Sequence, residues 1–303
     1  MPRYVVKRVL LAFVTVIIIS MITFFAMNAI PGGPFNKEKA SSPEVQAVLE
    51  KRYNLDKPVW EQYVIYMGNL VHGDWGISLK TGRDIWSTIS SSFAISARLG
   101  LMAAVTAIIF GLVLGSIAAL KRNHVADRCI IFFTTLATSM PSFVLASLFL
   151  LVFCVQLKWV PAWSATENHY LLPVIALALY PMAYITRLTK TSMLDSLGQD
   201  YVRTARAKGV PQSRVIFKHA LRNALIPVIT YVGPMIASIL TGSMVVESIF
   251  TIGGLGSKFV TGIINRDYPM IMATTIFLGV LMVCANLITD LVYKLVDPRI
   301  ELD

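Results

Sequence analysis

The hydrophobic residues of this chain fall into long continuous runs, and most polar residues lie between those runs. A run of about 20 apolar residues can cross a hydrocarbon core roughly 30 Å thick as an α-helix. Six such runs occur, at residues 9–30, 97–120, 129–156, 171–189, 223–246 and 269–293. The pattern predicts an all-α polytopic membrane protein with six transmembrane helices. The first run is too long for a signal peptide, and its Ala-Ile-Pro-Gly-Gly exit offers no convincing cleavage site, so we expect it to remain as a helix.

The longest polar segment, residues 31–96, joins the first two runs. Ser42-Pro43-Glu44 precedes spaced apolar residues, which predicts a capped helix that starts with proline. Pro58 and the spaced apolar residues after it predict a second helix. We therefore expect a small helical extracytoplasmic segment. It can be a cap packed on the membrane helices or a docking surface for another protein, and the two roles are compatible.

The charges support a membrane protein and predict its orientation. Only 15% of the residues are charged, whereas soluble domains carry roughly 25%. Short cytoplasmic loops are typically rich in lysine and arginine. The connections assigned to the cytoplasm carry Arg3, Lys7, Arg8, Lys121, Arg122, Arg128, Arg187, Lys190, Lys294, Arg299 and the basic residues of 200–223, and the short ones assigned outside carry Lys158, Lys258 and Arg266. Both termini are thus predicted in the cytoplasm, and the net charge of +10 indicates topology rather than nucleic-acid binding.

Residue types that hold metals or nucleotides are sparse. The chain has Cys129, Cys154 and Cys284 in or beside apolar runs, and four histidines without ligand spacing, so we expect neither a disulfide framework nor a metal site. The sequence GGLGSK at 253–258 lacks the Gly-Lys-Ser/Thr order of a phosphate-binding loop. No cofactor is therefore predicted in this chain, and its energy source must lie elsewhere.

Small residues and prolines recur within the runs. Gly111-x-x-x-Gly115, Gly233-x-x-x-Ala237 and Ser238-x-x-x-Gly242 have the spacing that lets membrane helices pack closely. Prolines lie inside or at the margins of runs at 141, 173, 181, 227 and 234. Such breaks persist where neighbouring groups or a cavity satisfy the freed backbone, which favours a translocation path between helices.

Two clusters are candidates for that path and its gate. Ser139, Met140 and Pro141 combine backbone irregularity with a flexible thioether, and Met244 and Glu247 add a second thioether and a carboxylate near the membrane. Ionisable groups in a membrane are functional candidates. A plain helix end near water explains Glu247 equally well.

The stretch DYVRTARAKGVPQSRVIFKHALRN, residues 200–223, is strongly basic. Gly209-Val210-Pro211 divides it into two predicted short helices, because glycine permits a turn and proline favours a first helical position. Arg214, Lys218 and Arg222 recur every four residues, which predicts an amphipathic hairpin at the membrane surface. An anchor to anionic lipid accounts for the charge but not for the break at Gly209.

This stretch resembles the cytoplasmic coupling loop of the membrane subunits of binding-protein-dependent ABC importers, whose pattern is Glu-Ala-Ala, three residues, Gly, nine residues and Ile-x-Leu-Pro. Aligned on Gly209, the chain has Arg203-Thr204-Ala205, His219, Leu221 and Arg222 at the patterned positions. Only the glycine, the second alanine and the leucine match the general pattern, but YVRTARAKG followed by HALRNALIP is the form of the peptide and nickel branch. YNLDKPVWEQY, GDWGIS, TGSMVVESIFTIGGLG, NRDYP and LVDPRI also resemble that branch. PGGPF and residues 92–100 most resemble the B-type membrane subunit of oligopeptide permeases.

The resemblance implies a type I ABC importer permease fold in a bacterial cytoplasmic membrane and a non-catalytic subunit for ATP-driven oligopeptide import. It implies a second homologous permease subunit, two cytoplasmic ATPases that bind ATP and Mg, an extracytoplasmic solute-binding protein and surrounding lipid. A dipeptide or nickel permease shares this architecture. An ion-coupled secondary transporter is the other alternative, but the apolar runs are nearly free of acidic or histidine relays, with Asp290 as the main exception.

On this basis the chain divides into residues 1–30, with the N-terminus and first span; 31–96, outside the membrane; 97–293, the transporter domain with a coupling loop at 195–222; and a cytoplasmic tail at 294–303. Residues 199–218 are expected to dock in a groove on the ATPase. The residues assigned to this contact are Tyr201, Arg203, Thr204, Ala205, Arg206, Ala207, Lys208, Gly209 and Pro211. Alternatively, Arg203, Arg206 and Lys208 serve only lipid contact or topology.

Overall fold

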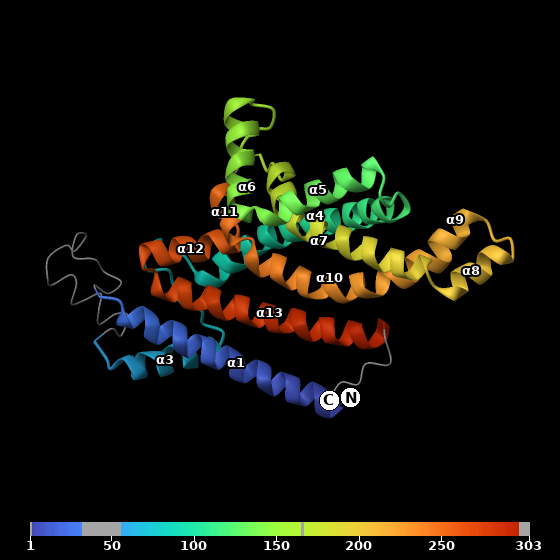
Figure 1. Ribbon diagram of the computed structural model, residues 1–303. Coiled ribbons are helices and arrows are strands. Elements are labelled where there is room, and N and C mark those ends of the chain that lie inside the picture. Colours follow the sequence, from blue (N-terminus) through green and yellow to red (C-terminus); the bar gives the residue numbers. More distant parts are fainter. Residues whose placement is uncertain (1, 32–55, 165–166, 297–303) are drawn as a thin grey trace. The chain divides into compact units, whose positions relative to one another are not determined.

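The computed structural model describes residues 2–31, 56–164 and 167–296, and regular structure in these ranges is helical apart from one isolated bridge between Ile77 and Asp84 (Figure 1). The elements are α1 (Pro2–Ala29), α3 (Val59–Val71), α4 (Ile85–Leu120), α5 (Val125–Ser139), α6 (Ser142–Phe149), the π-helix η2 (Leu150–Gln156), α7 (Leu171–Leu197), α8 (Asp200–Ala207), α9 (Gln212–Arg214), the π-helix η3 (Val215–Leu221), α10 (Arg222–Gly242), α11 (Met244–Ile249), α12 (Leu255–Asn265) and α13 (Tyr268–Val296). The predicted all-α class is confirmed.

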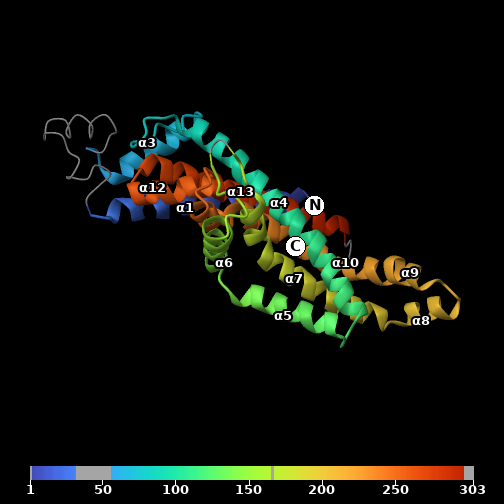
Figure 2. The ribbon, with the colours of Figure 1, turned by 90° about the horizontal axis from the view of Figure 1, so that it is seen from above.

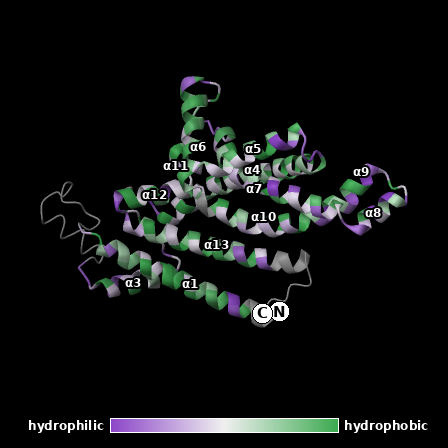
Figure 3. Ribbon diagram, viewed as in Figure 1, coloured by the Kyte–Doolittle hydropathy of each residue, from purple (hydrophilic) through white to green (hydrophobic). Residues whose placement is uncertain are grey.

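Five helical segments are long and apolar enough to cross a membrane: Val6–Ala29, Ile85–Leu120, Leu171–Leu197, Gln212–Ile249 and Tyr268–Asp290. Hydrophobic residues dominate these segments, whereas α8 and α9 carry many hydrophilic ones (Figure 3). The predicted third span, 129–156, is a bent pair, Val125–Ser139 and Ser142–Gln156, with an angle of 103° between its halves (Figure 2). The described residues therefore contain five continuous candidate spans, and the bent pair makes a sixth if it counts as one.

The bend in the third span lies at Met140 and Pro141. Met140 adopts an extended conformation, with φ −95° and ψ 131°, and ends α5. A proline disfavours the helical conformation of the residue before it and has no N–H to donate to the preceding turn. Pro141 then precedes the first residue of α6. The local sequence thus explains both the break and the restart of the helix.

The described chain forms two compact units, and α4 and α13 each pass from one unit to the other. The first unit contains residues 1–95 and 253–283. In it, apolar side chains of α1, α3, α12 and α13 form one core around Phe24, Met27 and Met272. A second cluster joins the start of α4 to α12 and α13 through Ile85, Ile89 and Leu255. Apolar burial therefore holds the segments before residue 96 to those after residue 252.

The second helix predicted in the segment 31–96 is confirmed. This helix is α3, and Tyr63 on it shares a hydrogen bond of 2.8 Å with Ser20 of α1. The loop after α3 is tied to the segment before α13, since the Ser78 hydroxyl donates to Asp267 at 2.5 Å and the Leu79 N–H donates to the other oxygen of the same carboxylate at 3.1 Å. The predicted helix after Ser42 lies outside the described residues.

The second unit contains residues 96–252 and 284–303, and close helix contacts occur at its small residues. A Cβ placed on Gly111 would lie 2.7 Å from Ile185, and one on Gly233 would lie 2.3 Å from Thr289. Gly115 is just as crowded, because its Cβ would come within 2.6 Å of the Thr186 carbonyl oxygen. The packing role predicted for the motifs at 111–115 and 233–237 is confirmed at these glycines.

The contact at Gly115 leads to a stability prediction. Gly115→Ala should lower the free energy of unfolding by about 1–3 kcal/mol, because the new methyl group meets backbone atoms of α7 that cannot move aside alone. The matched control is Gly279→Ala in α13, where a Cβ meets no atom within 4 Å. That change should be neutral or stabilise by up to about 1 kcal/mol through helix propensity. Thermal unfolding in detergent compares the two, and equal melting temperatures would contradict the prediction.

Candidate coupling hairpin and membrane cavity

The basic hairpin, residues 200–214, consists of α8, a tight turn and α9, and projects beyond the ends of α7 and α10 (Figure 1). Gly209 has φ +73°, a left-handed conformation that glycine adopts without strain. Its N–H donates to Arg206 O at 2.9 Å, and the Val210 N–H donates to Ala205 O at 3.2 Å. These two bonds form a Schellman motif that ends α8. The predicted break at Gly209 is confirmed.

The hairpin has a small apolar core of its own. Val202, Ala205 and Val215 are buried, and Leu197 and Val210 pack against them. Val202 and Ala205 share one face of α8 because residues three positions apart on a helix are neighbours. Ala205 was predicted to face a partner, but its side chain lies inside this core.

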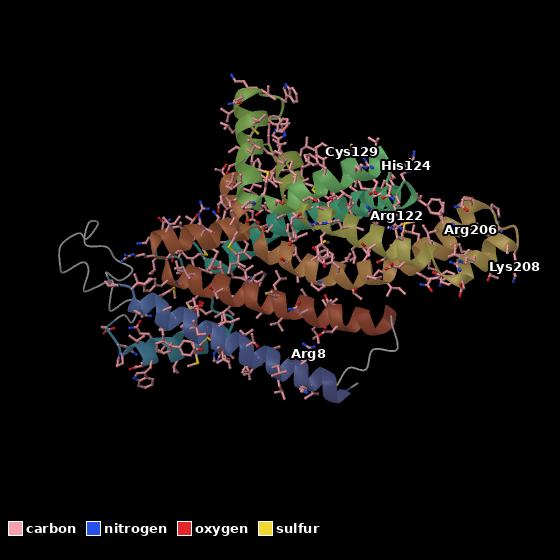
Figure 4. The ribbon with its side chains drawn as sticks, in the orientation of Figure 1. Arg8, Arg122, His124, Cys129, Arg206 and Lys208 are labelled. Carbon is pink, nitrogen blue, oxygen red and sulfur yellow. The ribbon has the colours of Figure 1, made fainter. Side chains whose placement is uncertain are left out.

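The other predicted contact residues are exposed. These are Tyr201, Arg203, Thr204, Arg206, Ala207, Lys208, Gly209 and Pro211. Arg203 lies 3.5 Å from Asp200, one turn earlier. Arg206 and Lys208 point outward near the tip of the hairpin, and neither forms an ion pair within the described residues (Figure 4). The hairpin therefore presents a cationic outer surface.

The base of the hairpin is attached firmly to α7 and α10. Met193 of α7 and Ala224 of α10 are buried in one cluster with Ala119 of α4. Asn223 donates a hydrogen bond of 2.9 Å to the Tyr201 hydroxyl. The sequence predicts a second short helix that is separate from the fifth span. In the structure, α9, η3 and α10 instead form one span from Gln212 onward. The hairpin is therefore continuous with α10.

A cavity of about 470 Å³ lies in the second unit beside the bend between α5 and α6. The residues that line it are Thr138, Ser139, Met140, Pro141, Ser142, Leu145, Ala176, Leu177, Tyr180, Pro181, Ser238 and Ile239. The structure thus brings the predicted cluster at 139–141 together with α7 and α10. Ser238, predicted as a packing residue, instead lines this space.

The second predicted gate cluster lies elsewhere. Neither Met244 nor Glu247 lines the cavity. Glu247 is fully buried, and the Ser243 hydroxyl donates to its carboxylate at 2.5 Å. Ser243 lies one turn before Glu247 and caps the start of α11. The helix-end interpretation near water is therefore wrong, and Glu247 is not open to the cavity.

Sequence analysis missed two polar links between α5 and α7. Lys190 lies 2.5 Å from Asp127, whose second oxygen accepts the Asn123 N–H at 2.9 Å. Arg187 donates to the Thr138 hydroxyl at 2.9 Å. Arg187 and Lys190 had been assigned to a loop as orientation charges, but both lie within α7. Arg187 and Lys190 lie three residues apart on α7, and no local pattern in the sequence signalled their contacts with α5.

The fold and this site define a helical membrane subunit with a cationic hairpin between two spans. Residues 111–302 match the family described as binding-protein-dependent transport system inner membrane component, and residues 1–100 match the N-terminal family of such components. The chain belongs to this family. It is a permease subunit of an ABC importer, and ATPase activity resides in separate subunits.

Curated relatives match over the full length. The chain is 47% identical over 304 residues to the dipeptide transport system permease protein DppB of Bacillus subtilis, covering 100% of this chain and 99% of the relative. It is 42% identical over 308 residues to the oligopeptide transport system permease protein OppB of Salmonella typhimurium, covering 99% of this chain and 100% of the relative.

Two solved structures share the fold. One is an inward-facing MetNI methionine ABC transporter, with a TM-score of 0.58, 14% identity and coverage of 70% of this chain and 97% of the solved chain. The other is an amino acid ABC transporter with histidines, with a TM-score of 0.54, 14% identity and coverage of 69% of this chain and 94% of the solved chain. The predicted type I ABC importer permease fold is confirmed.

Proposed function

We propose that this chain carries short peptides into the cell as one half of a heterodimeric permease, with a second similar subunit, two ATPases and an extracytoplasmic solute-binding protein. The names of the dipeptide and oligopeptide relatives support peptides as the cargo. In this arrangement both termini and the basic hairpin lie on the cytoplasmic side of the membrane. The hairpin carries the proposal, because its exposed cationic surface is continuous with a membrane span.

The hairpin transmits ATPase closure to the membrane helices. It docks on an ATPase through α8 and the turn at 208–211, and its buried core keeps α8 attached to Val215. The cluster around Met193 and Ala224 then moves with it, so that α7 and α10 change tilt together. Such coupling requires that the two ATPase states bind the hairpin with different affinities. The cavity at the bend between α5 and α6 then opens alternately to the two sides of the membrane.

Reconstitution tests the cargo and the energy source. The permease pair, its ATPases and the binding protein are placed in liposomes, and uptake of labelled trialanine is compared with uptake of nickel. We expect trialanine uptake only with ATP. Nickel uptake in its place would favour the nickel branch, and uptake driven by a proton gradient alone would contradict the proposal.

Substitution of the basic residues separates ATPase docking from lipid contact. Arg203→Gln, Arg206→Gln and Lys208→Gln together should impair uptake and the co-purification of the ATPases while the subunit remains in the membrane. Normal uptake would show that these charges serve lipid contact or topology only. Labelling of Lys208→Cys with an impermeant reagent should occur only from the cytoplasmic side, and labelling from outside would overturn the orientation.

A further inference from the structure

Arg187 places a positive charge within α7, the helix of a candidate membrane span. It lies ten residues before the end of α7, which corresponds to about 15 Å along the helix. Its side chain is half-buried and donates to the Thr138 hydroxyl at 2.9 Å. That hydroxyl already donates its own proton to a carbonyl of α5, so its oxygen is free to accept from Arg187. A threonine hydroxyl orients the guanidinium but leaves its charge uncompensated.

No carboxylate pairs with Arg187 in the described parts of the chain. Lys190, one turn further along α7, differs because Asp127 compensates its charge at 2.5 Å. Arginine has five N–H donors, and Thr138 takes one of them. An uncompensated charge in a membrane span is costly and typically faces a polar pathway or a partner group. Arg187 is therefore available to bind an anion.

The surroundings of Arg187 connect it with the cavity. Thr138, which holds the guanidinium, also lines the cavity of about 470 Å³. Tyr180 and Tyr184 share a face of α7 with Arg187 by their spacing of four and three residues, and they are 53% and 42% exposed. Tyr184 stacks on Tyr231 of α10 at 4.2 Å. Phenol groups and a cation on one exposed face fit a polar, peptide-sized ligand better than lipid chains.

We propose that the Arg187 guanidinium binds the C-terminal carboxylate of the peptide as the peptide passes the cavity. This inference rests on the proposed peptide import. The planar guanidinium forms paired hydrogen bonds with a carboxylate, which makes this contact strong and directional. Thr138 lines the cavity and holds the guanidinium one hydrogen bond away from it, and Tyr180, which also lines the cavity, offers its hydroxyl and ring face to the peptide backbone. The carboxyl end is common to all unmodified peptides, so this contact does not depend on side-chain sequence.

The test compares trialanine with trialaninamide, which lacks the carboxylate, in the complete reconstituted importer. In Arg187→Gln, uptake of trialanine should fall about tenfold or more, as expected for one lost charge-assisted contact. Uptake of trialaninamide should stay within about twofold of its wild-type rate. Arg187→Lys should retain more trialanine uptake than Arg187→Gln, because it keeps the charge. The binding protein is unchanged throughout, so its own preference cancels in each comparison.

Lys190→Gln serves as the matched control. It removes a charge one turn away that Asp127 already compensates. The uptake of both peptides should therefore change by the same factor, even where the substitution lowers the amount of complex. An equal loss of both peptides in Arg187→Gln would overturn the inference and indicate a structural contact, a lipid contact or a contact with the second permease subunit. Unchanged trialanine uptake would overturn it as well. Absence of ATP-dependent uptake in the wild type would instead contradict the proposed function.

Discussion

Gly209→Val should abolish ATP-dependent peptide uptake, while the subunit still inserts into the membrane. Gly209 has φ +73°, a conformation that a β-branched residue adopts only with strain. A Cβ at this position meets no atom within 4 Å, so the cost lies in the backbone of the turn alone. This cost is about 1–3 kcal/mol. Because α8 has only two buried side chains, the turn and the Schellman bonds should give way and the docking surface should be lost.

Gly209→Asn is the matched control, because asparagine tolerates the left-handed conformation and also ends helices. It should retain most of the uptake and most of the ATPase stimulation by the binding protein. The amount of subunit in the membrane, measured in parallel, should be the same for both variants. Similar uptake by the valine and asparagine variants would show that the backbone conformation at this turn is not needed for coupling.

The membrane helices could be predicted because they depend on continuous hydrophobicity, a property local to each segment. The hairpin turn was also predictable, since Gly209 and Pro211 determine it locally. The bend in the third span was not. Prolines 181, 227 and 234 lie inside unbroken helices, whereas Pro141 follows an extended residue and a bend of 103°. Whether a proline ends a membrane helix depends on the neighbours that satisfy its backbone, and these are distant in sequence.

The polar residues of the site also divide into those whose positions follow from the local sequence and those whose positions depend on distant contacts. The exposed basic face of α8 follows from its own sequence, but the buried position of Ala205 depends on Val215 across the turn. Arg187 and Thr138 are 49 residues apart, and no local pattern indicates that they meet. The burial of Glu247 was not predicted, because the packing around α11 that buries it is not visible in the local sequence. Contacts between helices decide these positions, and the hydrophobic pattern of one helix carries little information about them.

Removal of either partner of the ion pair between Asp127 and Lys190 alone should lower the free energy of unfolding. Lys190→Met leaves the carboxylate of Asp127, whose side chain is 7% exposed, without its cation. Breaking a fully buried pair costs about 3–5 kcal/mol, and because the Lys190 side chain is 20% exposed we expect a smaller loss of about 1–3 kcal/mol here. Asp127→Asn should cost a similar amount, because it leaves the ammonium group of Lys190 without a counter-charge. Thermal unfolding of the purified complex in detergent measures both losses.

The double variant Asp127→Asn/Lys190→Met should be more stable than either single variant. No uncompensated charge remains in it, and the asparagine oxygen can still accept the N–H of Asn123, which closes the turn between α4 and α5. The exposed pair Arg203 and Asp200, with side chains 74% and 95% exposed, serves as the control. Its neutralisation should change the melting temperature little. If the two single losses simply added in the double variant, the helices α5 and α7 would not be held by this pair, and Asp127 and Lys190 would act independently.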